Sequence, residues 1–282
     1  MASIRPFRGL RYNTRSPLDL ALVTAPPYDC ITTEQQNDLY RVHPHNIVRL
    51  ILNRTTSSDS AGDNRYSRAA QLLRLWREGG ILSQDEKPAV YIIEHEFDVE
   101  GKRYRREGFI ARVGLEEPES RIVLPHEETF TGPKEDRLKL LRATDCNLSA
   151  VMSLFDDPAG AVMAALKQGL PHAPDMQTVD GEGVVNRLWV QADPEVISVA
   201  QKLFASHSLY IADGHHRYET AAAYMKLLRE SGREVGPEHP AASIMTFCIP
   251  MNDPGLVIQP THRVIETLGG KFDLDRFRSL SS

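Results

Sequence analysis

The chain has 282 residues, of which 41% are hydrophobic and 25% are charged, and its formal net charge is -5. This length and composition are ordinary for a globular protein of one large or two modest domains with a buried core. The acidic balance gives no electrostatic support for a nucleic-acid partner, and no apolar run approaches the about 20 residues that span a bilayer.

The cysteines and the first residues bear on where the protein works. Cys30, Cys146 and Cys248 are far apart and odd in number, so they form neither a metal-binding spacing nor a disulfide framework. Residues 1–12 lack the hydrophobic segment of a secretory signal. We therefore expect a cytoplasmic protein with no membrane partner.

The first 88 residues are predicted to form two helices and one strand after an irregular start at 1–22. Pro26 and Pro27 impose extended backbone before the first helix. The predicted elements are a helix over 34–40 capped by Thr32 or Thr33, a buried strand over 46–52 that carries the charged Arg49, and an amphipathic helix over 66–78 ended by Gly79-Gly80.

A β-hairpin follows, with strands over 89–97 and 103–115 around the Gly-containing loop 98–102. His95 and its neighbours Glu94 and Glu96 alternate along the first strand, and we expect them on its solvated face. The hairpin belongs to a predicted N-terminal region, residues 1–118.

A second region is predicted over 119–282. Its expected elements are strands over 122–124, 151–155, 186–191, 209–212, 242–250 and 256–259, helices over 133–143, 159–170, 194–206 and 221–228, a loop over 171–178 and a new helix from about 274. Because the chain stops at Ser282 inside that last helix, we expect this region to be truncated at its C-terminus.

The segment 209–221 (LYIADGHHRYETA) predicts a strand, a sharp turn and a helix. The first backbone N–H groups of a helix lack intrahelical partners and carry partial positive charge, so they suit a phosphate. Gly214 permits a tight turn and close approach of a ligand. His215, His216 and Arg217 place cations where a helix normally has acids, and broken local rules are commonest at functional sites.

Other interpretations of this turn stay open. It could be a tight capped turn with surface histidines, or Glu219 could join either histidine as a metal-ligand pair. Adjacent histidines point about 100° apart on a helix, which argues against a structural zinc site. Asp213 could cap the helix or hold Mg²⁺.

The segment 125–130 (PHEETF) places Glu127 beside His126. Glu127 is a candidate general base or metal ligand, although a lone glutamate in a loop is usually only solvated. The basic helix that follows supplies Lys134 and Arg137, which could meet phosphate oxygens or could form a solvated face. Asp29 in APPYD could cap the next helix or project into the same site.

Five motifs, in order, carry a resemblance to a known family: APPYD, HNIVRL, HEETFTGPKEDRLKLLRAT, ADGHHRYETA and PTHRVI. The chain resembles a large family of prokaryotic proteins with the ADGHHRYETA signature, a conserved domain of unknown function. The resemblance covers nearly the whole chain.

More remotely, the chain is similar to the ParB/sulfiredoxin-like superfamily, whose members include nucleotide-dependent kinases of free serine. This resemblance implies an α/β (α+β) fold with a ParB/sulfiredoxin-like region after the N-terminal hairpin region. It implies Glu127 as the base and residues 213–217 as the phosphate cradle, with Asp213 and Arg217 taking part in catalysis.

The sequence therefore predicts a nucleotide-dependent phosphotransferase that uses ATP or ADP with Mg²⁺ and acts on a small hydroxyl-bearing metabolite such as serine. The alternative is a non-catalytic sensor that binds a nucleotide or phosphometabolite at the same cradle. DNA binding is not expected, because the net charge is acidic and no aromatic platform is visible. A homodimer is compatible with the sequence.

Overall fold

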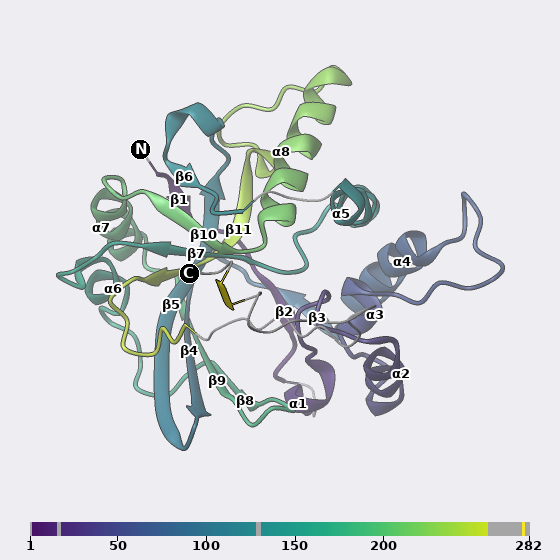
Figure 1. The fold of residues 1–282 in the computed structure, drawn as a ribbon, viewed down its shortest axis with the longest axis horizontal. Coiled ribbons are helices and arrows are strands. Elements are labelled where there is room, and N and C mark those ends of the chain that lie inside the picture. Colours follow the sequence, from purple (N-terminus) through teal and green to yellow (C-terminus); the bar gives the residue numbers. More distant parts are fainter. Residues whose placement is uncertain (1, 16–17, 128–130, 259–277, 280–282) are drawn as a thin grey trace.

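The computed structural model describes residues 2–15, 18–127, 131–258 and 278–279. Its centre is a mixed β-sheet with helices on both faces, which confirms the predicted α/β class (Figure 1). None of the helices in the described ranges is both long enough and apolar enough to cross a lipid bilayer.

The sheet has nine strands in the described part of the chain, in the order β6-β10-β7-β11-β5-β4-β9-β8, with β1 paired to β5. A separate pair joins β2 and β3. The strands are β1 (Ile4–Arg5), β2 (Leu10–Tyr12), β3 (Leu82–Gln84), β4 (Val90–Val99), β5 (Lys102–Gly114), β6 (Val123–Leu124), β7 (Val151–Phe155), β8 (Met176–Val179), β9 (Val185–Gln191), β10 (Leu209–Asp213) and β11 (Ser243–Pro250).

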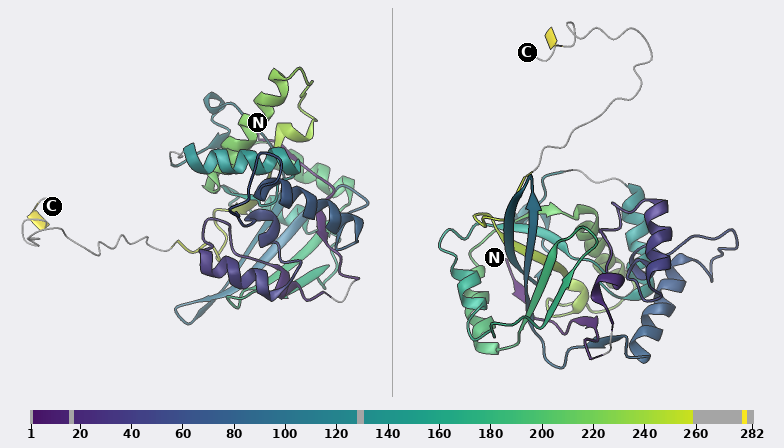
Figure 2. Two further views of the ribbon diagram at one scale, coloured as in Figure 1. Left: turned by 90° about the vertical axis from the view of Figure 1, so that its right-hand side faces the viewer. Right: turned by 90° about the horizontal axis from the view of Figure 1, so that it is seen from below.

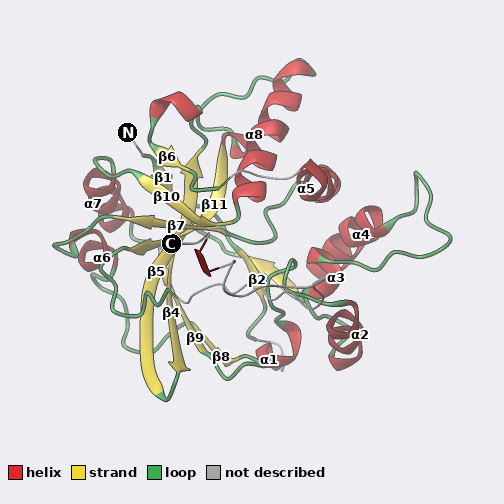
Figure 3. Ribbon diagram, in the orientation of Figure 1, coloured by secondary structure: helices red, strands yellow, loops and turns green. Residues whose placement is uncertain are grey.

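The helices divide between the two faces of the sheet. They are α1 (Leu20–Val23), α2 (Thr33–Val42), α3 (Val48–Ile51), α4 (Arg65–Glu78), α5 (Thr131–Thr144), α6 (Ala161–Leu166), α7 (Pro194–Phe204) and α8 (His215–Glu230). Figure 1 shows α6 and α7 on one side and α2 to α5 with α8 on the other, and Figures 2 and 3 show the same elements from further sides and by type.

The main core lies between the sheet and the α6–α7 side. Phe109, Phe155 and Phe204 meet there edge to face, with ring centroids 5.1 to 5.8 Å apart. A smaller core of Leu50, Leu73, Trp76 and Leu82 holds α3, α4 and β3 together. The layer formed by β2, β3, α3 and α4 is thus built on its own apolar cluster.

Local signals explain most confirmed elements. Thr32 and Gln35 form a capping box that begins α2, as predicted. The hairpin β4–β5 closes through Glu100 and Gly101, both at positive φ, which matches the right-handed twist of its strands. Helix α4, strands β6, β7, β9, β10 and β11, and helices α5, α7 and α8 also lie where they were predicted, while α6 is shorter than expected.

Several expectations were wrong. Residues 46–52 contain the short helix α3 rather than a strand, and Arg49 lies over the Tyr40 ring at 4.1 Å. The predicted loop 171–178 contains most of β8, which pairs with β9. The irregular start contains β1, β2 and α1, and residues 256–258 form no strand. Residue 259 and the motif 260–265 lie outside the described residues, as does nearly all of the predicted last helix.

The expectation that Glu94, His95 and Glu96 lie on a solvated face of β4 is also wrong. Glu94 is only 2% exposed and lies between Arg105 and Arg187, with Arg187 at 2.5 Å. On the opposite face His95 is partly buried beside Arg106 at 3.1 Å, and desolvation lowers its pKa to about 4. Alternation in a central strand therefore separates two covered faces rather than a wet and a dry one.

The predicted regions share one sheet, because β4 and β5 precede residue 118 while β7, β9, β10 and β11 follow it. The pairing of β5 with β11 joins them through six residue pairs in register. The boundary at residue 118 stays a prediction.

Candidate functional site

The predicted strand-turn-helix is present at residues 209–230. Strand β10 ends at Asp213, Gly214 turns the chain with φ of 90°, and α8 begins at His215. The N-cap residue of α8 is Gly214, which has no side chain to cap the helix. The positive end of the helix dipole therefore points at this turn.

Arg217 folds back over the turn. Its guanidinium pairs with Asp213 and donates to the carbonyl of Ala150. A Cβ atom at Gly214 would lie only 2.8 Å from Arg217 Nε, so glycine leaves the room that the guanidinium uses. Arg217 is 11% exposed and Asp213 is 52% exposed, so the pair opens to solvent on the carboxylate side.

The segment after β6 reaches the turn because β6 runs parallel to β10. His126 Nδ1 lies 2.5 Å from the carbonyl of Ile211, so it carries the proton and donates it. The His126 amide donates to Nε2 of His215 at 3.3 Å, and the two rings meet edge to face. Two sequence-distant motifs are therefore joined by direct contacts.

Glu127 contacts the buried ring of His215. Its Oε1 lies 2.8 Å from Nδ1 of His215, although off the line of an N–H bond, so this is a close charge contact rather than an aligned hydrogen bond. Burial lowers the pKa of His215, the nearby Glu127 opposes that shift, and His126 adds to it. A neutral ring also fits Nε2 accepting a hydrogen bond. Glu127 itself is 54% exposed.

Helix α5 packs against both α4 and α8. Lys134 pairs with Glu219 of α8 and is 36% exposed, so it borders the site. Arg137 is different: it is 8% exposed, pairs with Asp136 and donates to the carbonyl of Ile51 at 3.0 Å. Its guanidinium is engaged in packing, so its role as a phosphate ligand stays a prediction.

The turn that contains Tyr28 borders the same place. The Tyr28 ring lies 3.8 Å from the Arg137 guanidinium. Burial raises the pKa of Tyr28, and the positive charges of Arg137 and Arg217 partly oppose that rise. The pKa of Cys30 is raised by burial and by the charges of Asp29 and Asp213. Asp29 is exposed and does not cap α2, which Thr32 does.

Metal binding has only a partial basis here. Among the described residues, no group of three or more His, Cys, Asp or Glu could hold a metal ion. Mg²⁺ at nucleotide sites is often held by one or two carboxylates and the phosphates, so the half-exposed Asp213 fits that use.

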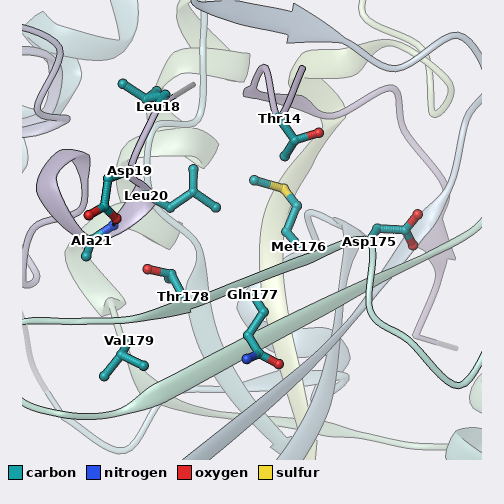
Figure 4. Close-up of a pocket in the computed structure, with 10 residues that line it drawn as sticks. All are labelled: Thr14, Leu18, Asp19, Leu20, Ala21, Asp175, Met176, Gln177, Thr178 and Val179. Carbon is teal, nitrogen blue, oxygen red and sulfur yellow. Dashed lines mark hydrogen bonds between the residues drawn. The ribbon is translucent and has the colours of Figure 1, made fainter. Parts of the chain in front are cut away.

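Two sizeable cavities bordered by described residues lie away from the turn. One, of about 580 Å³, lies between α1 and β8 and has Asp19 and Asp175 but no basic residue in its lining (Figure 4). Its described lining offers a phosphate no positively charged partner. The other, of about 740 Å³, lies against the sheet next to β2, β3, α3 and α4.

The structure thus brings together five predicted site residues: Glu127, Asp213, Gly214, His215 and Arg217. His216 follows in the first turn of α8 and Lys134 lies beside that helix, while Arg137 lies behind them. The sequence reasoning assigned no role to Tyr28, although its motif APPYD was visible. It also did not foresee that His126 would hold His215.

Comparison with known proteins gives one match to a family. The model of a family described as "Protein of unknown function (DUF1015)" matches residues 4–279, nearly the whole chain. No curated protein and no solved structure matches the chain.

Proposed function

The chain belongs to the DUF1015 family, whose description assigns no function, and from its site we propose a nucleotide-dependent phosphotransferase that acts on a small hydroxyl-bearing metabolite. ATP or ADP would be the donor, and free serine is the first acceptor to test. The resemblance to the ParB/sulfiredoxin-like superfamily is part of this proposal, as are a cytoplasmic location and a homodimer.

One observation supports it most: a half-exposed carboxylate and a helix start with a glycine N-cap, which come from distant segments, lie at one place. Glu127 reaches that place from the segment after β6, and Gly214 begins α8 there. Phosphoryl transfer requires mainly positioning and neutralisation of charge, which a helix start and basic side chains supply.

The cations of the site would change partners when a nucleotide binds. Arg217 is paired with Asp213, and Lys134 with Glu219. A phosphate at the start of α8 would draw Arg217 toward its oxygens, because charge-assisted bonds to phosphate are strong. The released Asp213 carboxylate would then be free to hold Mg²⁺. The ion, when bound, neutralises charge on the phosphate oxygens.

Glu127 would accept the proton of the acceptor hydroxyl. As that oxygen bonds to the terminal phosphorus, the bond between this phosphorus and the bridging oxygen breaks, and the nucleotide leaves one phosphate shorter. His215 would act as a positioning residue, since its buried ring contacts Glu127 and is itself held by the His126 amide.

The test is the variant Glu127→Gln. A general base contributes typically ~10²–10⁴-fold to a rate, so we expect turnover to fall by roughly that factor while ATP or ADP still raises the melting temperature. Product is followed by phosphorus NMR and mass spectrometry over a panel of serine, other hydroxy amino acids and sugars. Glu195→Gln, an exposed site at the start of α7, is the matched control and should behave as wild type.

Normal turnover by Glu127→Gln would refute the assignment of the base. Loss of nucleotide binding in that variant would instead mean that Glu127 supports the site structurally.

A second candidate function is a non-catalytic sensor of a nucleotide or phosphometabolite. It would use the same cations, because a phosphate can bind by displacing Asp213 from Arg217 or Glu219 from Lys134 without any transfer. Saturable thermal stabilisation by ATP or ADP with Mg²⁺, without product from any acceptor, would support the sensor.

A further inference from the structure

A cavity of about 740 Å³ separates the central sheet from the layer built by β2, α3, α4 and β3. Its size falls in the range of small-molecule sites, and apolar surface dominates its lining. Its floor is formed by side chains of β5, β8, β9 and β11, namely Ile110, Arg112, Met176, Leu188 and Met245.

The strand registers explain why these side chains share one face. Met245 lies directly opposite Arg112, and Met176 directly opposite Leu188. Ile110 lies two residues from Arg112 and therefore points the same way. These side chains are only partly buried although β5, β9 and β11 lie inside the sheet, whereas Phe109 and Ala111 on the other face are fully buried. Because the layer of β2, β3, α3 and α4 packs on its own core, a space remains between that layer and this part of the sheet.

The charged residues of the cavity lining are mostly basic. They are four arginines and a single aspartate: Arg8, Arg11, Arg77, Arg112 and Asp145. Arg11 is already paired with Asp85, and Asp145 accepts a hydrogen bond from Tyr224.

Arg112 differs from the others, because its Nε is buried and has no hydrogen-bond partner among the described residues. The acid whose charge acts on Arg112, Glu238, is bonded to Arg5 at 3.3 Å. A buried donor without an acceptor is costly, so a ligand that supplies one would be favoured.

We propose that this cavity binds a small amphipathic monocarboxylate. Its carboxylate pairs with the Arg112 guanidinium, whose planar fork matches the two carboxylate oxygens. Its apolar body lies on Ile110, Leu188 and Met245. Arg112 has a buried Nε with no partner among the described residues, and one carboxylate is enough to supply its acceptor.

The cavity is distinct from the start of α8, but the two share a wall. Cys146, Asn147 and Leu148 line this cavity and also a small pocket that Arg217 and Arg137 border. The monocarboxylate site does not depend on the proposed phosphotransferase activity, and its test uses no nucleotide.

The experiment measures binding of octanoate by calorimetry to the full chain, with octanol and octyl phosphate as comparisons. We expect one saturable site for octanoate, at least tenfold weaker binding of octanol, and no gain from octyl phosphate. Arg112→Gln should lower octanoate affinity at least tenfold and remove its preference over octanol. Arg103→Gln, an exposed arginine on the same strand, is the control and should bind as wild type.

Met245→Trp should block both ligands by filling the cavity. In the wild-type chain, octanoate should also shift the methyl NMR signals of Met176 and Met245, a measurement that does not depend on any variant folding. The proposal is overturned if octanoate fails to bind or leaves those methyl signals unchanged. It is also overturned if Arg112→Gln binds octanoate like wild type, or if octyl phosphate binds more tightly than octanoate.

Discussion

Replacing Gly214 with alanine tests the geometry at the start of α8. The residue has φ of 90°, and its new Cβ would lie 2.8 to 2.9 Å from three atoms of the Arg217 guanidinium. Gly232, just beyond the other end of α8, has a similar φ of 82° but open space around it. Gly232→Ala is therefore a matched control that carries the backbone cost alone.

The expected magnitudes follow from these two differences. A left-handed conformation costs a non-glycine residue about 1–2 kcal/mol, which applies to both variants. In Gly214→Ala the guanidinium must also leave Asp213 and the Ala150 carbonyl, which adds about 1–2 kcal/mol for a half-exposed pair with one charged hydrogen bond. We expect Gly214→Ala to lose about 2–4 kcal/mol, and Gly232→Ala about 1–2 kcal/mol.

Urea denaturation measures both unfolding free energies, and thermal melts should separate the variants by roughly 2–4 °C per kcal/mol. Thermal stabilisation by ATP should be weakened in Gly214→Ala, because the Cβ occupies the approach to the helix start, and unchanged in Gly232→Ala. If the two variants matched in stability and in response to ATP, Arg217 would not lie over Gly214 as described.

Two further predictions concern the central strand β4. His95 accepts a hydrogen bond from Arg106 on its neutral ring, and burial lowers its pKa from 6.5 to about 4. As the pH falls below 6.5, His95 therefore gains a proton in the unfolded chain before it does in the folded chain. We expect about 2 kcal/mol of stability to be lost between pH 6.5 and 5. Urea titrations at both pH values should show this loss reduced in His95→Gln; an unchanged loss would exclude His95 as its source. Glu94→Gln should cost about 2–3 kcal/mol, less than a fully buried pair because its partners are partly exposed. Glu96→Gln, more exposed on the same face, should cost clearly less, and equal losses would argue against burial as the cause.

The predictions that failed share a physical cause. The apolar run at 46–52 fits a buried strand or a buried helix equally well, and only packing against α4 selects the short helix α3. Strand β8 has only four residues, and the two in its centre, Gln177 and Thr178, are polar, so its own sequence gives no strand pattern. Its pairing with β9 makes it a strand. The sequence predicts a solvated Glu94 because its partner Arg187 lies on another strand, 93 residues away.

Local chemistry alone determined the hairpin at Glu100–Gly101, the capped start of α2, and the strand, turn and helix around Gly214. Each depends on groups within a few residues, so the order of amino acids contains the full cause. The meeting of Glu127 with His215, the engagement of Arg137 in packing, and the cavity beside Arg112 depend instead on how distant elements pack. Contacts of that kind arise from the order of the strands in the sheet and from the packing of the layers on each other. The tertiary structure alone decided them.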